Sequence, residues 1–528
     1  MKKRKHFVLT IILCMTITLI SGCGQNEATS SGNESTDDIL KVGLDFSSYE
    51  TIDVMKTTYT DIFQISDCIC ETLMGKDPKT LETFPLLVKD FPEVSEDGLT
   101  YKFNLKENVK FHDGTILDTE DVLYTFERIF NPNTMSPMAW LVEMIEGAKE
   151  YTDGKADTIT GIKAIDENIF TIKLTYKYSP FVATLAASPL AIISKDACEA
   201  AGDNWGISQY IGTGPFALEG FESGSKIILK RNEEYHNGPK EISGIDFISL
   251  DASTALLEFE AGNIDLCGLS NELAEEYKSD EKYSKNVNYQ NYFGVYTLIL
   301  NQGIEPLNDK RVREAFSLSI DRVAIAQDYF NGNVTEAYTF LPPGIAGHDD
   351  ALVYKRDIEK AKKLLSDAGY SEGITITTYI PENDDVLTVV KEQVSEAGIN
   401  LDIKLADAAT VSDMRTNGKL AFWTLMWYAD YNDADEFLYG VFHSNMANFF
   451  STGFKDSDFD KKLDEARGII DANEKTKIYK QLDHEITYEK IGNVPMYFPG
   501  SYYLVSDRVS NIGMKKDFLL WLVDAKIA

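Results

Sequence analysis

The sequence lacks the short motifs that mark most catalytic sites. Its six histidines never pair at i, i+4, and none adjoins a cysteine at a zinc-like spacing. It contains no GxSxG elbow and no GxxxxGK loop, and no GxGxxG follows a predicted strand. With 84 Asp and Glu residues, a carboxylate pair carries no information about glycosidase chemistry. These absences argue against a hydrolase, a metal enzyme or a nucleotide-dependent enzyme, so we expect no catalytic residue, metal or cofactor.

Cysteine is also scarce, with six residues in 528, which excludes a disulfide-dense scaffold. We expect Cys68 and Cys70 on one helix from Asp61 to Met74, where side chains two residues apart point about 200° apart and cannot bond each other. They are interpreted as buried thiols. One remote disulfide among four cysteines remains open: Cys68, Cys70, Cys198 and Cys267.

Basic residues are fewer than acidic ones, with 51 Lys and Arg against 84 Asp and Glu. The formal net charge is −33, and it becomes −37 if the first 22 residues, with their four basic and no acidic side chains, are removed. A strongly acidic chain is repelled by phosphate backbones, so nucleic acid is excluded as a partner. The field mildly favours cationic or zwitterionic ligands, but its main effect is on solubility.

Long apolar runs are absent apart from one near the N-terminus. Lys2 to Lys5 form a basic segment, and Phe7 to Ile20 is an apolar stretch of fourteen residues. A membrane span needs about 20 residues, so residues 1–22 are predicted to be a signal peptide. The stretch ends in Ser21-Gly22-Cys23, which resembles a bacterial lipobox; the alternative is an ordinary signal peptide with a chance cysteine. We predict that Cys23 carries diacylglycerol and palmitate, which makes the chain a lipoprotein.

Residues 23–38 contain almost no apolar side chain larger than alanine. Such a segment cannot pack, so we expect a flexible tether. The predicted location is the extracytoplasmic face of a bacterial cell membrane, with the body held off the surface by this tether.

The remaining chain divides by pattern into two halves. The first half is rich in alternating strands, at residues 39–46, 99–105, 169–174 and 226–231, with a helix capped by Asp118. In the second half, Asn308 and Asp357 are expected to cap helices, and residues 374–380, 384–397 and 399–405 form a βαβ unit. Strands are also predicted at residues 421–427 and, as one strand-like piece, from Val494 to Val505.

Eight segments occur in the order found in one protein family. They are Asp97–Leu105, Val109–Gly114, Thr119–Tyr124, Gly212–Phe216, Leu229–Tyr235, Asp309–Phe316, Lys360–Tyr370 and Trp427–Asp433. Together they resemble the peptide/nickel solute-binding proteins of ABC transporters, known as extracellular solute-binding protein family 5, and in particular the oligopeptide/dipeptide-binding branch. The resemblance extends from Ile39 to the end of the chain.

The resemblance implies an α/β, two-lobed periplasmic-binding-protein-like fold of type II (the large cluster), with an extra subdomain inserted in the first lobe. Lobe I would comprise residues 39–75, 203–295 and 494–528, the inserted subdomain residues 76–202, and lobe II residues 296–493. Ligand would bind between the lobes and close them about hinges near Tyr296 and Val494, and the permease would recognise the closed form.

The resemblance also implies a ligand site around Trp427–Asp433. Asp430 follows a predicted strand and matches the carboxylate that holds a peptide α-ammonium in the oligopeptide-binding branch. Trp427, Trp423 and Tyr431 are the other ligand-binding candidates. The two tryptophans share one strand face, where they either line a pocket or belong to the core. Thr424 stands where some relatives carry a basic residue for the ligand carboxylate, so that partner is not identified.

The function that follows is capture of short peptides by a non-enzymatic, monomeric lipoprotein that delivers them to the permease and ATPase subunits of an ABC importer. Alternatives with the same fold are binding of a nickel chelate, haem or sugar. A further alternative is a lipoprotein that senses a peptide signal without importing it.

Overall fold

A computed structural model describes residues 38–528, which form one compact unit. The predicted signal peptide, Cys23 and all but the last residue of the tether lie outside the described residues. Within residues 38–528, no helix has the length and hydropathy needed to cross a membrane.

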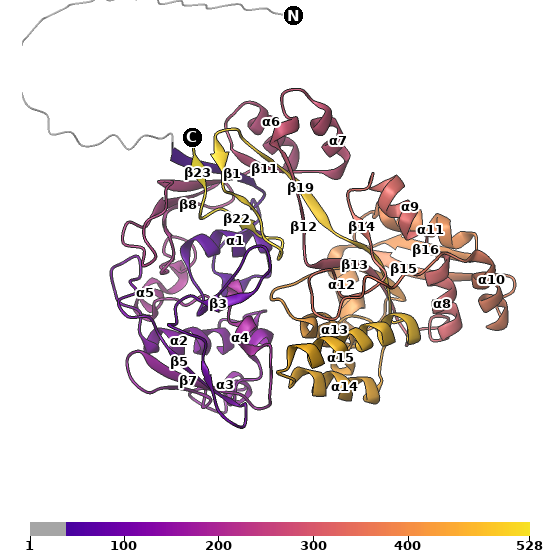
Figure 1. Cartoon of the computed structure of the whole chain (residues 1–528), viewed down its shortest axis with the longest axis horizontal. Helices are drawn as coiled ribbons and strands as arrows, with labels where there is room; N and C mark the ends of the chain where they lie inside the picture. The colour runs from indigo at the N-terminus through magenta and orange to yellow at the C-terminus, as the bar shows by residue number, and fades with distance from the viewer. Residues whose placement is uncertain (1–37) are drawn as a thin grey trace, which may run out of the picture. The chain divides into compact units, whose positions relative to one another are not determined.

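The largest sheet has seven strands and gathers segments from both ends of the chain (Figure 1). Its order is β12 (Val287–Asn291), β19 (Gly500–Val505), β11 (Leu266–Leu269), β1 (Ile39–Leu44), β10 (Gly244–Ser249), β9 (Lys226–Arg231) and β8 (Phe216–Glu222). The central strand β1 runs parallel to β10 and β11, and the outer pairings are antiparallel. Helix α1 (Thr60–Ile69) packs on this part of the chain, in the same hydrophobic core as β1.

A smaller antiparallel sheet lies between β1 and β8 in the sequence, with the order β4 (Glu93–Val94), β5 (Thr100–Asn104), β7 (Ile169–Lys173) and β6 (Ile162–Ala164). Alternation along β5 and β7 turns Phe103 and Phe170 inward, where their rings stack with centroids 5.1 Å apart. Beside this sheet, α2 (Thr119–Phe130) begins at the predicted cap Asp118, whose carboxylate accepts from the Glu120 amide.

The second half builds another four-stranded sheet, with the order β14 (Thr335–Glu336), β18 (Asn493–Phe498), β13 (Gly294–Leu300) and β17 (Phe422–Tyr428). The predicted βαβ unit is confirmed: β15 (Ile374–Ile380) pairs in parallel with β16 (Ile399–Leu405), and α11 (Asp385–Ser395) connects them. Other helices here are α8 (Lys310–Ser319), α10 (Ile358–Asp367), α12 (Ala408–Thr416), α13 (Ala434–Phe442), α14 (Ser457–Arg467) and α15 (Ala472–His484). The strongly alternating and capped patterns therefore folded as expected.

Two strand connections join the two large sheets. The chain passes from β12 to β13 at residues 292–293 and from β18 back to β19 at Pro499, and the Tyr292 amide donates to the Pro499 carbonyl (3.2 Å). The prediction of one strand-like piece from Val494 to Val505 is therefore wrong, because Pro499 and Gly500 divide it between two sheets. The division into lobe I, insert and lobe II stays a prediction.

Two helix boundaries differ from expectation. The helix expected from Asp61 to Met74 ends at Ile69, because the Ile69 carbonyl accepts from the Gly214 amide (2.9 Å) and Cys70 is extended. Asp309, rather than Asn308, caps α8: the Asp309 side chain accepts from the Arg311 amide (2.8 Å). Both differences come from hydrogen bonds that a periodic pattern does not reveal.

The prediction of buried thiols is confirmed for the residues described, whereas Cys70 follows α1 and does not share the helix with Cys68. Cys68, Cys70, Cys198 and Cys267 are buried and free, so no disulfide forms among them. Burial raises the pKa of each thiol, to about 12 for Cys267, which keeps these groups protonated and unreactive.

The Gly212–Phe216 motif is a bend pressed against the end of α1. A Cβ on Gly212 would overlap the Ile69 carbonyl oxygen and lie 2.6 Å from the Cys70 sulfur. His112 binds the same bend: its Nδ1 accepts from the Gly212 amide (3.3 Å), so its Nε2 donates to the Gly214 carbonyl (2.9 Å). Burial lowers the pKa of His112, which favours this neutral form.

Replacing Gly212 with alanine should lower the free energy of unfolding by about 1–3 kcal/mol, because the methyl group meets fixed backbone. Chemical denaturation measures the loss. Gly268→Ala is the matched control, since a Cβ at Gly268 meets nothing within 4 Å. Equal stability of the two variants would contradict the close approach.

Candidate functional site

Asp430 lies just beyond the carboxyl end of β17, the strand at one edge of its sheet. The Ala429 amide donates to the Phe293 carbonyl (2.8 Å), which fixes the end of the strand beside the connection between the sheets. Asp430 therefore lies beside the connection that joins the two large sheets.

A buried carboxylate shapes the turn that carries Asp430. The two oxygens of Glu436, on α13, accept from the Asp430 amide (2.9 and 3.1 Å), and one also accepts from the Tyr431 amide (3.2 Å). Asp433 then caps α13 by accepting from the Asp435 amide (2.9 Å). The sequence analysis missed Glu436, because an acidic residue in the first turn of a helix ordinarily indicates only favourable capping.

Residues from the first half of the chain close over this turn. Lys76, on β2 (Met74–Lys76), donates through Nζ to the Asp430 carbonyl (3.3 Å) and pairs with Asp517 at 2.6 Å. Asn432 donates to the Thr80 carbonyl (2.6 Å). Asp430 therefore stands at a junction between distant parts of the chain.

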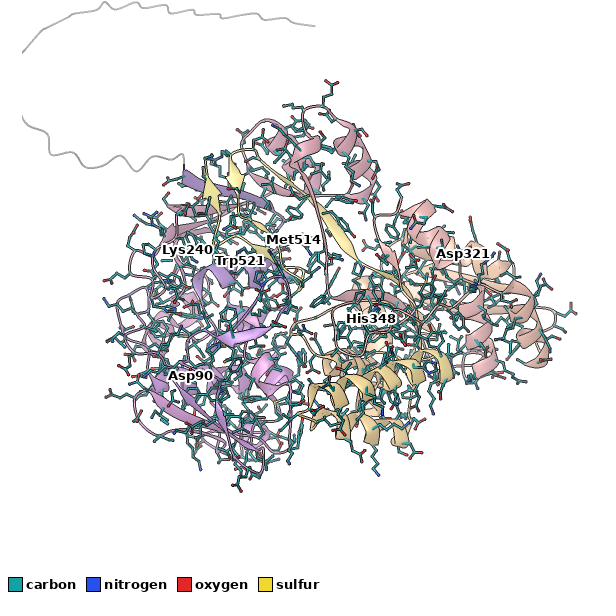
Figure 2. The ribbon with its side chains drawn as sticks, in the orientation of Figure 1. Asp90, Lys240, Asp321, His348, Met514 and Trp521 are labelled. Atoms are coloured by element: carbon teal, nitrogen blue, oxygen red, sulfur yellow. The ribbon has the colours of Figure 1, made fainter. Side chains whose placement is uncertain are left out.

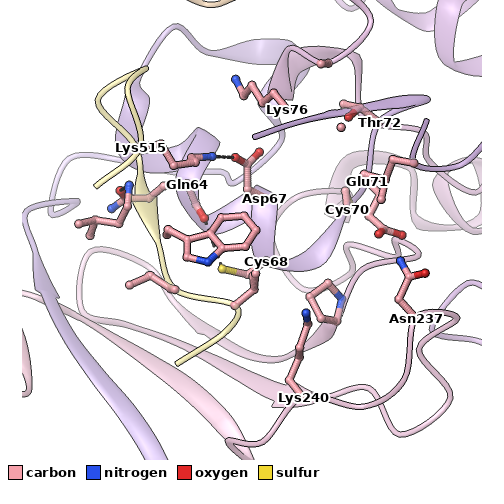
Figure 3. Close-up of a pocket in the computed structure, with 18 of the residues that line it drawn as sticks. Gln64, Asp67, Cys68, Cys70, Glu71, Thr72, Lys76, Asn237, Lys240 and Lys515 are labelled. Carbon is pink, nitrogen blue, oxygen red and sulfur yellow. Dashed lines mark hydrogen bonds and ion pairs between the residues drawn. The ribbon is translucent and has the colours of Figure 1, made fainter. Parts of the chain in front are cut away.

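The hairpin β21 (Gly513–Met514) and β22 (Leu520–Trp521) brings further charges to this junction. Met514 and Trp521, which end its two strands, are labelled in Figure 2. At its tip, Lys515 pairs with Asp67 of α1 (2.6 Å), an interaction drawn in Figure 3. We call six residues the junction cluster: Asp67, Lys76, Asp430, Glu436, Lys515 and Asp517.

The junction cluster is incompletely neutralised. It holds four carboxylates and two ammonium groups, so its formal charge is −2 when every group is ionised. Both ammonium groups are already committed to Asp517 and Asp67. Among the residues that the structure describes, no hydrogen bond reaches the carboxylate of Asp430.

The electrostatic environment reflects this excess of negative charge. Burial raises the pKa of the Asp430 carboxyl group; Lys76 opposes the rise and Asp517 adds to it. Burial also raises the pKa of Glu436 well above its usual range, and the charge of Asp430 raises it further. A cation placed beside Asp430 would relieve both effects.

The two candidate tryptophans lie against the core beside α13. Trp423 donates through Nε1 to the Phe450 carbonyl (2.7 Å), and Trp427 meets the Phe450 ring edge-on with centroids 5.5 Å apart. Both rings are half-buried, and Trp427 Nε1 has no acceptor among the described residues. Packing and one hydrogen bond thus explain the position of Trp423, whereas the indole N–H of Trp427 has no acceptor among the described residues.

Tyr431 is placed inside the protein. It is 2% exposed, and its hydroxyl forms a hydrogen bond with the Tyr178 hydroxyl (2.9 Å). Nearby, Ser179 donates its amide to the Arg467 carbonyl (2.7 Å), and the Arg467 guanidinium lies 4.6 Å from the Tyr178 ring centre. Tyr431 is thus part of a contact between residues 176–180 and α14. This contact holds the turn that carries Asp430 in place.

Arg415 is a second residue that the sequence analysis missed. Its guanidinium lies 5.2 Å from the ring centre of Trp423 and 5.1 Å from that of Phe449. No carboxylate pairs with it in the part of the chain that the structure describes. An arginine near the end of a helix has no distinctive sequence signal, and only its stacking on aromatic rings sets it apart.

A pocket borders the junction cluster. It has a volume of about 260 Å³ and is lined by Lys76, Lys515 and Asp67 together with Cys68, Cys70 and Glu71 (Figure 3). Over the described range 38–528, no group of three or more His, Cys, Asp or Glu side chains is arranged to hold a metal ion.

Comparison with known proteins relates this arrangement to one family. Residues 82–449 match the model for bacterial extracellular solute-binding proteins, family 5. The periplasmic oligopeptide-binding protein OppA of Salmonella typhimurium is 26% identical over 431 residues, which cover 76% of this chain and 77% of that protein. Heme-binding protein A of Haemophilus influenzae is 28% identical over 415 residues, which cover 74% of each.

Solved structures confirm the predicted fold class. The structure of Haemophilus influenzae OppA in complex with RPPGFSPFR has a TM-score of 0.76 at 24% identity, covering 93% of this chain and 99% of that one. DppA from Helicobacter pylori in complex with the peptide STSA has a TM-score of 0.75 at 23% identity, covering 92% and 98%.

The hydrogen bond between Tyr178 and Tyr431 should contribute about 1 kcal/mol to stability, as a buried neutral pair does. The double variant Tyr178→Phe, Tyr431→Phe should lose less stability than the sum of the two single variants, since each single change leaves one hydroxyl unpaired. A double-mutant cycle measured by denaturation gives the coupling energy. A coupling of zero would show that the two hydroxyls do not interact.

Proposed function

Since the chain belongs to the family 5 bacterial extracellular solute-binding proteins, which are non-enzymatic transport components, we propose that it captures short peptides and delivers them to the permease of an ABC importer. We further propose that Cys23 carries a lipid anchor and that residues 23–38 tether the protein at the extracytoplasmic face of the membrane. Lobe I, the insert and lobe II would close around the ligand.

The observation that carries the peptide assignment is the carboxylate of Asp430, to which no described residue donates, in a junction cluster whose formal charge is −2 when every group is ionised. The α-ammonium of a peptide is the complementary group, because it brings three donors and one positive charge. A charge-assisted hydrogen bond of this kind contributes about 1.5–3 kcal/mol.

The edge position of β17 supports the same proposal. An edge strand presents a row of backbone donors and acceptors that an extended peptide can pair with. A peptide anchored at Asp430 and lying along β17 would gain affinity that does not depend on its side chains. Arg415, stacked on Trp423 of the same strand, is a cation available to an acidic group of the guest.

The relatives support peptides without excluding haem. Two similar solved structures hold peptides, whereas one similar protein is named for haem. A nickel chelate and a sugar are further alternatives within this fold, as is sensing of a peptide signal without import. Native mass spectrometry of the protein purified from cells separates the ligand classes by mass, and we expect short peptides.

Asp430→Asn should weaken binding of a free tripeptide by about tenfold or more, corresponding to the loss of about 1.4 kcal/mol or more. The N-acetylated tripeptide should bind weakly to both proteins, because it has no ammonium for Asp430 to hold. Isothermal titration calorimetry gives the four affinities.

Glu372→Gln is the matched control, since it removes one negative charge at an exposed position that forms no hydrogen bond or ion pair with the described residues. Its affinity should equal that of the parent protein. If acetylation leaves the affinity unchanged, Asp430 does not bind the peptide ammonium.

Peptide affinity should also fall as the pH decreases from about 7 to about 5. The carboxylate must be ionised to bind the ammonium, and burial raises the pKa of Asp430, so protonation begins at a higher pH than for an ordinary aspartate. Calorimetry at several pH values measures the decline. The Asp430→Asn variant should show a flatter profile, and an equally steep one would assign the titration to another group.

A further inference from the structure

A second pocket, of about 400 Å³, opens at the carboxyl end of β1 and has no role in the site described above. Its walls are mostly apolar and come from β1, the residue that follows β10, β11, β19 and the C-terminal hairpin: Leu44, Leu250, Leu266, Leu269, Tyr502, Tyr503, Met514, Phe518 and Leu520. This volume is at the small end of the about 300–1,000 Å³ typical of small-molecule pockets. It accommodates one long side chain with some water.

The pocket adjoins the proposed peptide site through Phe518. This residue lines the pocket and stacks on Tyr428, with ring centroids 4.9 Å apart and planes 16° apart. Tyr428 is the last residue of β17, two positions before Asp430. A peptide that begins at Asp430 therefore passes the pocket with one of its first side chains.

The charged groups of the pocket are acidic. Asp45 and Asp61 both line it, and none of the described lining residues is a lysine, arginine or histidine. Asp45 is exposed and accepts from the amide and hydroxyl of Ser47. Burial raises the pKa of Asp61, a hydrogen bond from Tyr49 opposes the rise, and the charge of Asp45 adds to it, so the two carboxylates repel each other. A cation between them would remove this repulsion. Tyr49, whose ring stacks on that of Tyr59 with centroids 4.5 Å apart, donates a hydrogen bond to Asp61 beside the pocket.

Two further features favour binding of a ligand in this pocket. Gln64 is 4% exposed and lines the wall; its Oε1 accepts from the Leu520 amide (3.2 Å), but its Nε2 has no acceptor among the described residues. A guest carbonyl oxygen, or a water that enters with the guest, would complete this donor. Gly268, on β11, leaves open space where a side chain would otherwise stand. Glycine inside a strand often marks close approach of a ligand.

We propose that this pocket binds a lysine or arginine side chain of the captured peptide, with the aliphatic stem against the apolar walls and the cationic end between Asp45 and Asp61. This inference rests on the proposed function, since it needs a peptide anchored at Asp430. It makes the protein selective for basic peptides, with Asp61 as a specificity-determining residue.

The test uses trialanine and tripeptides in which one alanine is replaced, at each position in turn, by lysine, norleucine, glutamate or tyrosine. At one position, lysine should bind about tenfold more tightly than norleucine, which has a similar apolar stem and no charge. Glutamate at that position should bind more weakly than alanine. Calorimetry on the intact protein gives each affinity.

Two variants assign the effect to the pocket. Asp61→Asn should remove most of the affinity advantage of lysine over norleucine, whereas the control Glu372→Gln should leave that advantage intact. Gly268→Phe should fill the pocket and remove the gain from both lysine and norleucine, with trialanine still bound.

The outcomes separate this inference from the proposed function. If trialanine binds and acetylation weakens it, but lysine and norleucine bind equally at every position, the pocket assignment is overturned and the peptide-binding function stands. A preference for tyrosine that Gly268→Phe abolishes and Asp61→Asn leaves intact would overturn the cationic specificity. If no tripeptide binds, the proposed function fails, and the pocket assignment fails with it.

Discussion

The arrangement of the site depends on a set of buried charges that do not cancel. Lys76 and Lys515 each neutralise one carboxylate, and Asp430 and Glu436 remain without a cation of their own. Breaking a buried ion pair such as that between Lys76 and Asp517 typically costs about 3–5 kcal/mol. The junction cluster therefore combines stable ion pairs with an excess of negative charge. This combination is expected of a site that binds a cationic ligand.

The frame is assembled from widely separated segments. Strand β2 supplies Lys76, the hairpin near the C-terminus supplies Asp517, and β17 with α13 supplies Asp430 and its support. The hydrogen bond from Lys76 to the Asp430 carbonyl links the first and second halves of the chain directly. A ligand that alters the charge at Asp430 thus acts where these segments meet, and such a position suits a protein that signals occupancy by closing.

The acidic pocket and the junction cluster have similar electrostatic environments. In both, a partly desolvated carboxylate, Asp61 or Asp430, lies near a second acidic group, and each pocket or cluster borders apolar or aromatic surface. The large negative net charge of the chain extends this preference over its surface and favours the approach of cationic molecules. Peptides rich in lysine or arginine satisfy the local and the long-range requirement together.

Local patterns in the sequence determined much of the secondary structure. Strands β9, β15 and β16 have the predicted bounds, and α2 begins at its predicted cap, because alternation and capping act over a few residues. The ordered motifs also identified the family and its fold, and they singled out Asp430 through resemblance. The end of α1 and the division of the chain at Pro499 were not predicted, since hydrogen bonds to distant segments decide them.

What only the tertiary structure decided is which charges meet. Glu436 and Arg415 look like ordinary helix residues in the sequence, and no sequence pattern pairs Tyr431 with Tyr178. The fold instead turns Glu436 onto two backbone amides, leaves Arg415 stacked on Trp423 without a carboxylate, and engages the Tyr431 hydroxyl with Tyr178. The physical reason is that desolvation and charge pairing depend on distance in space. A chain of amino acids encodes that distance only through packing of the whole molecule.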